Sequence, residues 1–252
     1  MNTQGYIKTE IINQVAYLTF FHLASNSLPS ELLDKLTQAF NELGGNEQVK
    51  SIVLQSEGRI FCAGASFDEL ILLQDMEKAH QFFMGFANVI NAMRKADKFI
   101  IVKVQGKAVG GGVGLIAAAD YAMATDAAAI KLSELSIGIG PYVIAPALKR
   151  KMGNTALSEM SINAAHWHTA FWAREKGLFA QVFDNQNQLN EAVEILAEQL
   201  AKYDTDATSF LKKELWKGTE DWDALLSAQA EISARLVLQD FTKEKLANFK
   251  NK

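Results

Sequence analysis

A glycine triplet and one isolated glutamate are the residues whose types best suit chemistry in this sequence. Gly110, Gly111 and Gly112 lie between an apolar run, 99–104, that predicts a buried strand, and a small-residue run, 113–119, that predicts a helix. Glycine permits a sharp turn and a close approach by another molecule. The first amides of a helix lack partners within it and lie at its positive end. The junction can therefore bind an anion or an oxygen that gains charge, and a close-packed structural turn is the alternative.

Glu134 lies in a loop, 133–142, that is otherwise rich in apolar residues and glycine. A carboxyl group in such surroundings tends to have a raised pKa, which suits proton transfer. A capping or salt-bridged glutamate is the alternative interpretation. A second small-residue turn, 63–65, leads into a predicted helix that Ser66 or Asp68 can cap.

Composition excludes several classes of protein. A chain of 252 residues with 49% hydrophobic and 21% charged residues is typical of one large globular domain, or a core with an appendage. The net charge of −4 argues against nucleic-acid binding driven by bulk electrostatics. A single cysteine, Cys62, excludes an internal disulfide framework. His166 and His168 are the only close histidine pair, without an acidic partner at a familiar spacing, so we expect no metal site.

The N-terminal residues and the lengths of the apolar runs predict the cellular location. Residues 1–5 are polar and show no signal peptide. No run reaches the roughly 18 apolar residues that a membrane span requires. We therefore expect a cytoplasmic protein without a membrane segment.

Hydrophobic periodicity predicts an α/β fold. Strands are expected over 6–12, 15–21, 51–55, 99–104, 121–124, 130–132 and 178–184. Helices are expected over 30–43, 69–95 with an interruption near 74–75, and 113–119, and the chain is mostly helical from 145. Residues 188–252 are expected to be helical throughout, as an appendage rather than a separate domain.

Four ordered motifs together resemble those of the crotonase family, the enoyl-CoA hydratases and isomerases. They are Asn26-Ser27-Leu28, residues 61–65, residues 106–120, and Ser133-Glu134-Leu135 with Gly138 and Pro141. Residues 247–250 also resemble the tail of that family. The resemblance covers nearly the whole chain. It implies a spiral of ββα turns over 1–187 and a helical region over 188–252 that forms trimers, often paired into hexamers.

The resemblance also implies a site. A CoA thioester would lie between the two small-residue turns as substrate, with no separate cofactor. The amides of Ala65 and Gly111 would hold its oxygen, and Glu134 would act as general acid and base. The implied substrate-binding residues are Ala63, Gly64, Ser66, Gly110, Gly112, Gly114, Pro141 and Tyr142. Lys243 and Lys245 are candidates for the CoA phosphates, with ordinary surface lysines as the alternative.

Two positions depart from the family pattern. Many hydratases carry a further catalytic glutamate where this chain has Gly114, and an aspartate where it has Ser66. One acid can still shuttle one proton, as double-bond isomerisation requires. A narrower resemblance joins residues 110–115 and 133–146 to methylglutaconyl-CoA hydratases, and to dehydratases that act on hydroxymethylglutaryl groups on polyketide carrier proteins.

These observations predict reversible hydration of an α,β-unsaturated acyl-CoA thioester, with methylglutaconyl-CoA as a candidate substrate. A Δ3-Δ2 enoyl-CoA isomerase and a non-catalytic CoA-binding protein are the alternatives. A hydrolase using Cys62 or Ser66 is disfavoured because neither has a recognisable base. The acyl chain, a CoA or carrier-protein handle, and trimer or hexamer remain open. An aromatic cluster, His166-Trp167-His168 with Phe171-Trp172, receives no role.

Overall fold

The computed structural model describes residues 5–250, with only the backbone of 249 and 250. Residues 1–4, on which the expectation of no signal peptide depends, lie outside the described part. So do the last two residues and the side chains that end the family-like tail.

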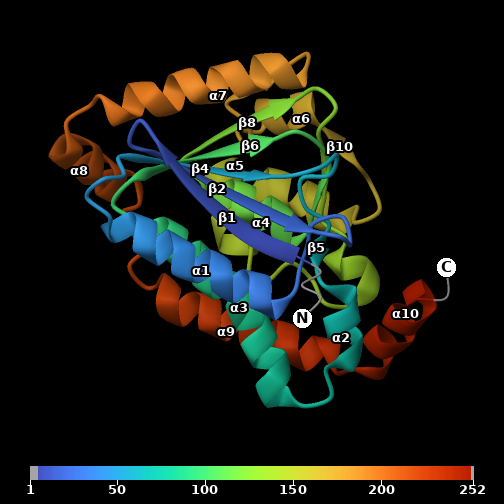
Figure 1. The fold of residues 1–252 in the computed structure, drawn as a ribbon. Coiled ribbons are helices and arrows are strands. Elements are labelled where there is room, and N and C mark those ends of the chain that lie inside the picture. The colour runs from blue at the N-terminus through green and yellow to red at the C-terminus, as the bar shows by residue number, and fades with distance from the viewer. Residues whose placement is uncertain (1–4, 251–252) are drawn as a thin grey trace.

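A six-stranded sheet forms the centre of the molecule, in the order β1-β2-β4-β6-β8-β11 (Figure 1). Its strands are β1 (Gly5–Ile12), β2 (Val15–His22), β4 (Ser51–Ser56), β6 (Phe99–Val104), β8 (Tyr121–Thr125) and β11 (Gln181–Phe183). Only β1 and β2 are antiparallel to each other; the other neighbours run parallel. Asn13 and Gln14, between the strands predicted over 6–12 and 15–21, have φ of 51° and 65°, which a tight hairpin turn requires.

Two small sheets carry the small-residue turns. One pairs β3 (Ser27–Leu28) with β5 (Gly64–Ala65). The other has the order β10-β9-β7, built from β10 (His168–Thr169), β9 (Ala129–Lys131) and β7 (Ala108–Val109). β5 leads into α2 (Phe67–Leu72) and β7 into α4 (Gly111–Ala118). Each turn therefore connects a short strand to the start of a helix.

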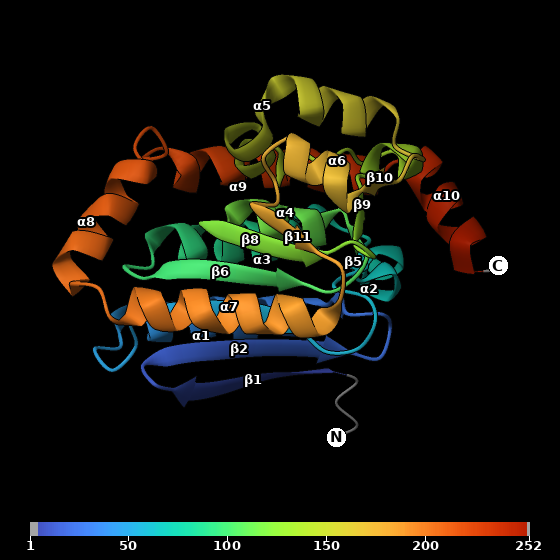
Figure 2. The ribbon, with the colours of Figure 1, turned by 90° about the horizontal axis from the view of Figure 1, so that it is seen from above.

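Helices cover both faces of the large sheet (Figure 2). On one face, α1 (Ser30–Gly45), α3 (Met76–Lys95) and α4 enclose the main core, and α9 (Trp222–Val237) packs on α3. On the other face, α7 (Gln186–Ala201) packs Leu189, Val193 and Ala197 against the sheet. The central strands are apolar on both faces for this reason. The α/β fold class is confirmed.

The remaining helices surround this core. They are the single-turn η1 (Glu134–Ile137), α5 (Ala145–Ile162), α6 (Ala170–Glu175), α8 (Thr205–Leu215) and α10 (Asp240–Lys250). α10 lies beside α2 and η1, as Figure 1 also shows for α2. None of the described helices has the length and apolar character that crossing a membrane requires.

Capping side chains and a glycine set several helix boundaries. The interruption near 74–75 is confirmed: Asp75 caps the start of α3, and its side chain accepts a hydrogen bond from the Lys78 amide at 2.8 Å. The expectation of unbroken helix over 188–252 is wrong. Asp204 caps the start of α8, and Gly218 adopts φ +81° after it. The last strand is also shorter than predicted, because Leu178 lies in the buried turn after α6.

The proposed boundary between 187 and 188 falls inside α7. Trp222, Leu226, Ala230 and Ala234 of α9 share the main core with α3 and the sheet. The C-terminal helices are thus part of one packed unit with the strands that precede them. Their role in forming trimers stays a prediction.

Candidate active site

A cavity of about 60 Å³ lies where the two small-residue turns meet η1 and the loop that follows it. This volume is room for a few water molecules. Among the residues that line it are eight of the predicted site residues, namely Ala63, Gly64, Ala65, Gly110, Gly111, Glu134, Pro141 and Tyr142. The cavity thus brings both small-residue turns together with Glu134, Pro141 and Tyr142.

The amides of Ala65 and Gly111 belong to the two small-residue turns that line the cavity. The Ser66 amide donates to Leu28 O at 3.2 Å. Since successive amides of an extended strand point in opposite directions, the Ala65 amide points away from β3. Gly111 is the first residue of α4, so its amide has no acceptor within the helix. A Cβ placed on Gly64 would lie 3.7 Å from the Gly111 nitrogen, which shows how closely the two turns approach.

The missing side chain of Gly110 leaves room for the carboxyl group of Glu134. Gly110 has φ +51°, and its amide donates to Lys131 O at 2.9 Å. A Cβ at this position would lie 2.6 Å from Oε1 of Glu134 and 3.1 Å from its carboxyl carbon. The carboxyl group therefore rests directly against the glycine backbone, next to the start of α4. A side chain at 110 would displace it and also strain the turn.

The carboxyl group of Glu134 is held without a counter-charge. Its Oε2 is buried and has no hydrogen-bond partner among the described residues, and Glu134 forms no ion pair with them. Burial raises the pKa of Glu134 from 4.5 to about 7, opposed by a hydrogen bond from its own backbone. Burial disfavours the charged form of an acid. A carboxyl group with a pKa near neutrality can both accept and return a proton.

Most of the other side chains that line the cavity are apolar. The apolar side chains that line it are Phe67, Leu70, Phe83, Phe86, Val109, Ile137, Ile139, Val143 and Ile144. Phe83 and Phe86 are buried residues of α3. Ser233 of α9 also lines the cavity, and no sequence signal indicated it. Among the described lining residues there is no lysine, arginine or histidine.

Three predicted substrate-binding residues do not line the cavity. Ser66 caps α2 by accepting from the Glu69 amide at 3.4 Å. A Cβ on Gly112 would lie 2.6 Å from that of Cys62, and one on Gly114 would overlap Ile144. Ser66 thus caps a helix, and Gly112 and Gly114 allow close packing of α4 against Cys62 and Ile144.

Cys62 is buried among these turns, and its Sγ accepts a hydrogen bond from the Gly64 amide at 3.4 Å. Burial raises the pKa of the Cys62 thiol to about 12. Because the thiolate is the nucleophile, this environment disfavours the hydrolase alternative that would use Cys62.

The other candidate polar residues lie outside the cavity. Lys243 lines a separate hollow beside Leu70 and Leu73, and the Lys245 ammonium lies 5.4 Å from the Phe241 ring centre. Their contact with CoA phosphates stays a prediction. His168 is buried, with its ring centre 4.0 Å from that of Trp172. In the described part of the chain, no three histidine, cysteine or acidic residues gather as metal ligands would.

Comparison with known proteins gives the class to which this fold and site belong. The model of the enoyl-CoA hydratase/isomerase family matches residues 10–252. The chain therefore belongs to the enoyl-CoA hydratase/isomerase family, as the resemblance to crotonases predicted.

Individual relatives are distant. A probable enoyl-CoA hydratase of Bacillus subtilis is 28% identical over 189 residues, which cover 75% of this chain and 73% of the relative. The bacillaene synthase dehydratase PksH of the same organism is 29% identical over 164 residues, covering 64% of this chain and 62% of the dehydratase. The crystal structure of an enoyl-CoA hydratase from Bacillus halodurans superimposes with a TM-score of 0.90 at 24% identity, covering 96% of this chain and 99% of the other.

Proposed function

We propose that this protein catalyses the reversible addition of water to an α,β-unsaturated acyl-CoA thioester, with Glu134 as its one acid–base residue. The observation that carries the proposal is the buried, unpartnered Oε2 of Glu134 in a cavity that also meets both small-residue turns. The names of the two Bacillus subtilis relatives, a hydratase and a dehydratase, describe the two directions of this reaction.

The proposed step moves one proton and uses no other acid. Glu134, as carboxylate, takes a proton from water while the water oxygen forms a bond to Cβ of the enoyl group. The electrons of the double bond move toward the thioester oxygen, which the amides of Ala65 and Gly111 stabilise. The protonated Glu134 then gives its proton to Cα, and the thioester is restored. Loss of one such amide donor typically costs about 3 kcal/mol of transition-state stabilisation.

The cavity favours an apolar acyl group. A carboxylated acyl chain, such as the methylglutaconyl group that the narrower resemblance suggested, would meet no cationic side chain among the described lining residues. Burying an unpaired carboxylate is unfavourable. We therefore propose a short, uncharged enoyl group as the substrate, and 3-methylglutaconyl-CoA becomes the compound to test against it.

The position of Ile144 supports a second candidate function, the isomerisation of a 3-enoyl thioester. Its side chain lines the cavity beside Gly114, so the second acid of the two-glutamate hydratases is replaced by an apolar wall. Isomerisation of a 3-enoyl thioester needs only one carboxyl group. Glu134 would take a proton from Cα and return it to the γ carbon, while the same two amides stabilise the dienolate.

Absorbance at the enoyl-thioester band separates these functions. We expect purified protein to remove the absorbance of crotonyl-CoA, and to act more slowly on 3-methylglutaconyl-CoA. Increasing absorbance with 3-hexenoyl-CoA, without loss from crotonyl-CoA, would instead establish the isomerase. No change with any of the three would count against both reactions on CoA thioesters.

A further inference from the structure

Two lysines and a tryptophan share the outer face of the small sheet β10-β9-β7. The buried row across this sheet consists of His168, Ile130 and Ala108. Side chains alternate along a strand, so the adjoining residues Trp167, Lys131 and Lys107 lie on the opposite, outer face. Trp167, from the aromatic cluster without a role assigned from the sequence, therefore lies beside Lys107 and Lys131.

Both lysines lie against one indole ring. The Lys107 Nζ is 4.9 Å and the Lys131 Nζ 4.7 Å from the centre of the Trp167 ring. An indole ring attracts each ammonium group, but the two ammonium groups repel each other. Neither lysine forms an ion pair with a carboxylate of residues 5–248. An anion bound between them would remove the repulsion, so the arrangement favours an anionic ligand.

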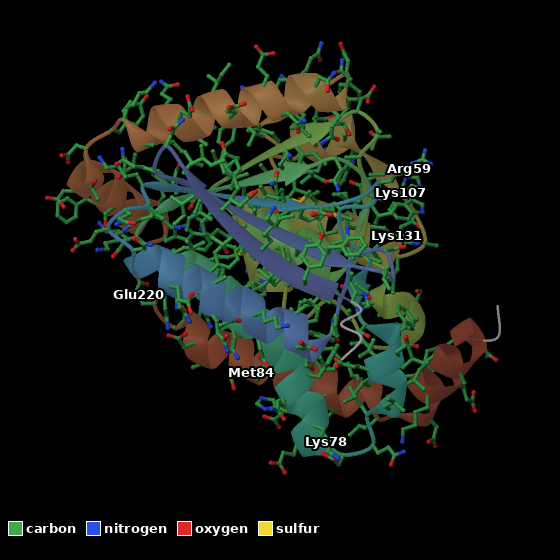
Figure 3. All side chains as sticks on the ribbon, in the orientation of Figure 1. Arg59, Lys78, Met84, Lys107, Lys131 and Glu220 are labelled. Carbon is green, nitrogen blue, oxygen red and sulfur yellow. The ribbon has the colours of Figure 1, made fainter. Side chains whose placement is uncertain are left out.

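This face is continuous with the catalytic cavity. Lys131 lines a groove that shares Phe67, Val109, Ser133 and Ile137 with the cavity of Glu134. Figure 3 shows Lys107 and Lys131 on the same side of the molecule. Asp68 also lines the groove, without an ion pair to Lys131. A ligand whose reactive end reaches Glu134 can therefore extend along the groove to Lys131, whose ammonium group shares the Trp167 ring with that of Lys107.

We propose that Lys107, Lys131 and Trp167 form a phosphate-binding subsite for the phosphopantetheine handle of the substrate thioester. This inference rests on the proposed function only in taking a thioester as the ligand. The same phosphate ester occurs in CoA and on a carrier protein, and both present it at the end of the pantetheine chain. Trp167 positions the two ammonium groups, and the lysines bind the phosphate oxygens.

The first test compares saturated thioesters that the proposed reaction does not consume. Calorimetry would measure the Kd of butyryl-4′-phosphopantetheine and of butyryl-pantetheine, which lacks the phosphate. We expect the wild-type protein to bind the phosphorylated compound about tenfold more tightly, the effect of a charge-assisted contact. The preference should weaken as salt is added. Equal affinity for the two compounds would overturn the proposal.

Variants test whether Lys107 and Lys131 cause the preference for the phosphorylated compound. The double variant Lys107→Ala/Lys131→Ala should lose the preference for phosphate, whereas Lys131→Arg should keep most of it. Lys35→Ala, which removes a lysine that pairs with Glu31 on α1, is the control and should match wild type. Asp68→Asn should tighten binding of the phosphorylated compound, because one repelling charge is removed. A double variant that retains the full preference would contradict the proposal.

A final comparison identifies the source of the phosphate. Butyryl-CoA and a butyryl-loaded carrier protein are titrated into wild type and the double variant. Tighter binding of either one identifies the natural handle, and the double variant should weaken it about tenfold. An equal Kd in both proteins would reject the subsite. Because these are binding measurements, the subsite can stand even if hydration is not observed.

Discussion

Ile144 fills the space beside Gly114. A Cβ on Gly114 would lie 2.7 Å from the Cβ of Ile144, and Ile144 itself lines the cavity that holds Glu134. Position 114, where the crotonase resemblance implies a second glutamate in many hydratases, is thereby closed by an apolar side chain. Glu134 is left as the one carboxyl group among the described residues that line the cavity.

This contact predicts that substitutions at Gly114 and Ile144 have coupled effects on the free energy of unfolding. Gly114→Ala should lower the free energy of unfolding by about 1–3 kcal/mol, because the added methyl group overpacks the site. Ile144→Ala alone should also destabilise, through the cavity it leaves. The double variant should be less destabilised than the sum of the two, as measured by urea unfolding. Gly45→Ala is the control, since nothing lies within 4 Å of its added Cβ. Strict additivity would refute the contact.

Glu134 should make stability depend on pH. Its pKa rises from 4.5 to about 7 on folding, so the folded state binds more protons between these values. Stability should therefore fall as pH rises from 5 to 8, and the loss should level off above pH 7. Glu134→Gln removes this term, so the variant should gain about 1–3 kcal/mol relative to wild type between pH 5 and pH 8. Parallel pH profiles for the two proteins would show that the carboxyl group is not destabilised by burial.

The same pKa predicts the pH dependence of hydration. The step begins with Glu134 as carboxylate, so kcat/KM for crotonyl-CoA should rise with pH and reach half its maximum near pH 7. Initial rates at low substrate concentration across pH 5–9 would measure this. A midpoint near pH 4.5 would indicate that Glu134 is solvated in the working enzyme.

A buried ion pair should hold α8 to the core. The Lys212 Nζ lies 3.0 Å from an oxygen of Asp120, with 2% and 7% of their side chains exposed. Lys212 also donates to Met93 O and Lys98 O. Lys212→Ala should cost about 3–5 kcal/mol, because it leaves the Asp120 charge buried.

The neighbouring lysine is a matched control for this pair. Lys213 pairs with Asp97 at 3.1 Å, but its side chain is 62% exposed. Lys213→Ala should therefore change stability by less than about 1 kcal/mol. Thermal or urea unfolding of both variants would compare them, and equal losses would mean that burial of the Lys212 pair carries no special cost.

The sequence predicted those parts of the fold and site that depend on local patterns. The strand before Gly110 and the isolated character of Glu134 follow from residue types over a few positions. The breaks at Asp204 and Gly218 also have local signals, a capping side chain and a glycine, but the helical composition around them hid both.

Other features depend on contacts between distant segments, which one sequence does not record. Ile144 closes the space beside Gly114, Ser233 reaches the cavity from α9, and Trp167 meets Lys107 and Lys131 only because β7, β9 and β10 pair. The two-residue β10 is too short to show a strand pattern. Its position is set by pairing with β9 rather than by its own sequence.

The most direct test of the account is the turnover of crotonyl-CoA by Glu134→Gln beside wild type, with the Kd of butyryl-CoA measured for both. Glutamine keeps the size of the side chain but cannot accept and return the proton. We predict that kcat falls by about 10²–10⁴, the usual contribution of an acid–base residue, while the Kd changes little. A variant that hydrates crotonyl-CoA at the wild-type rate would contradict the central role of Glu134.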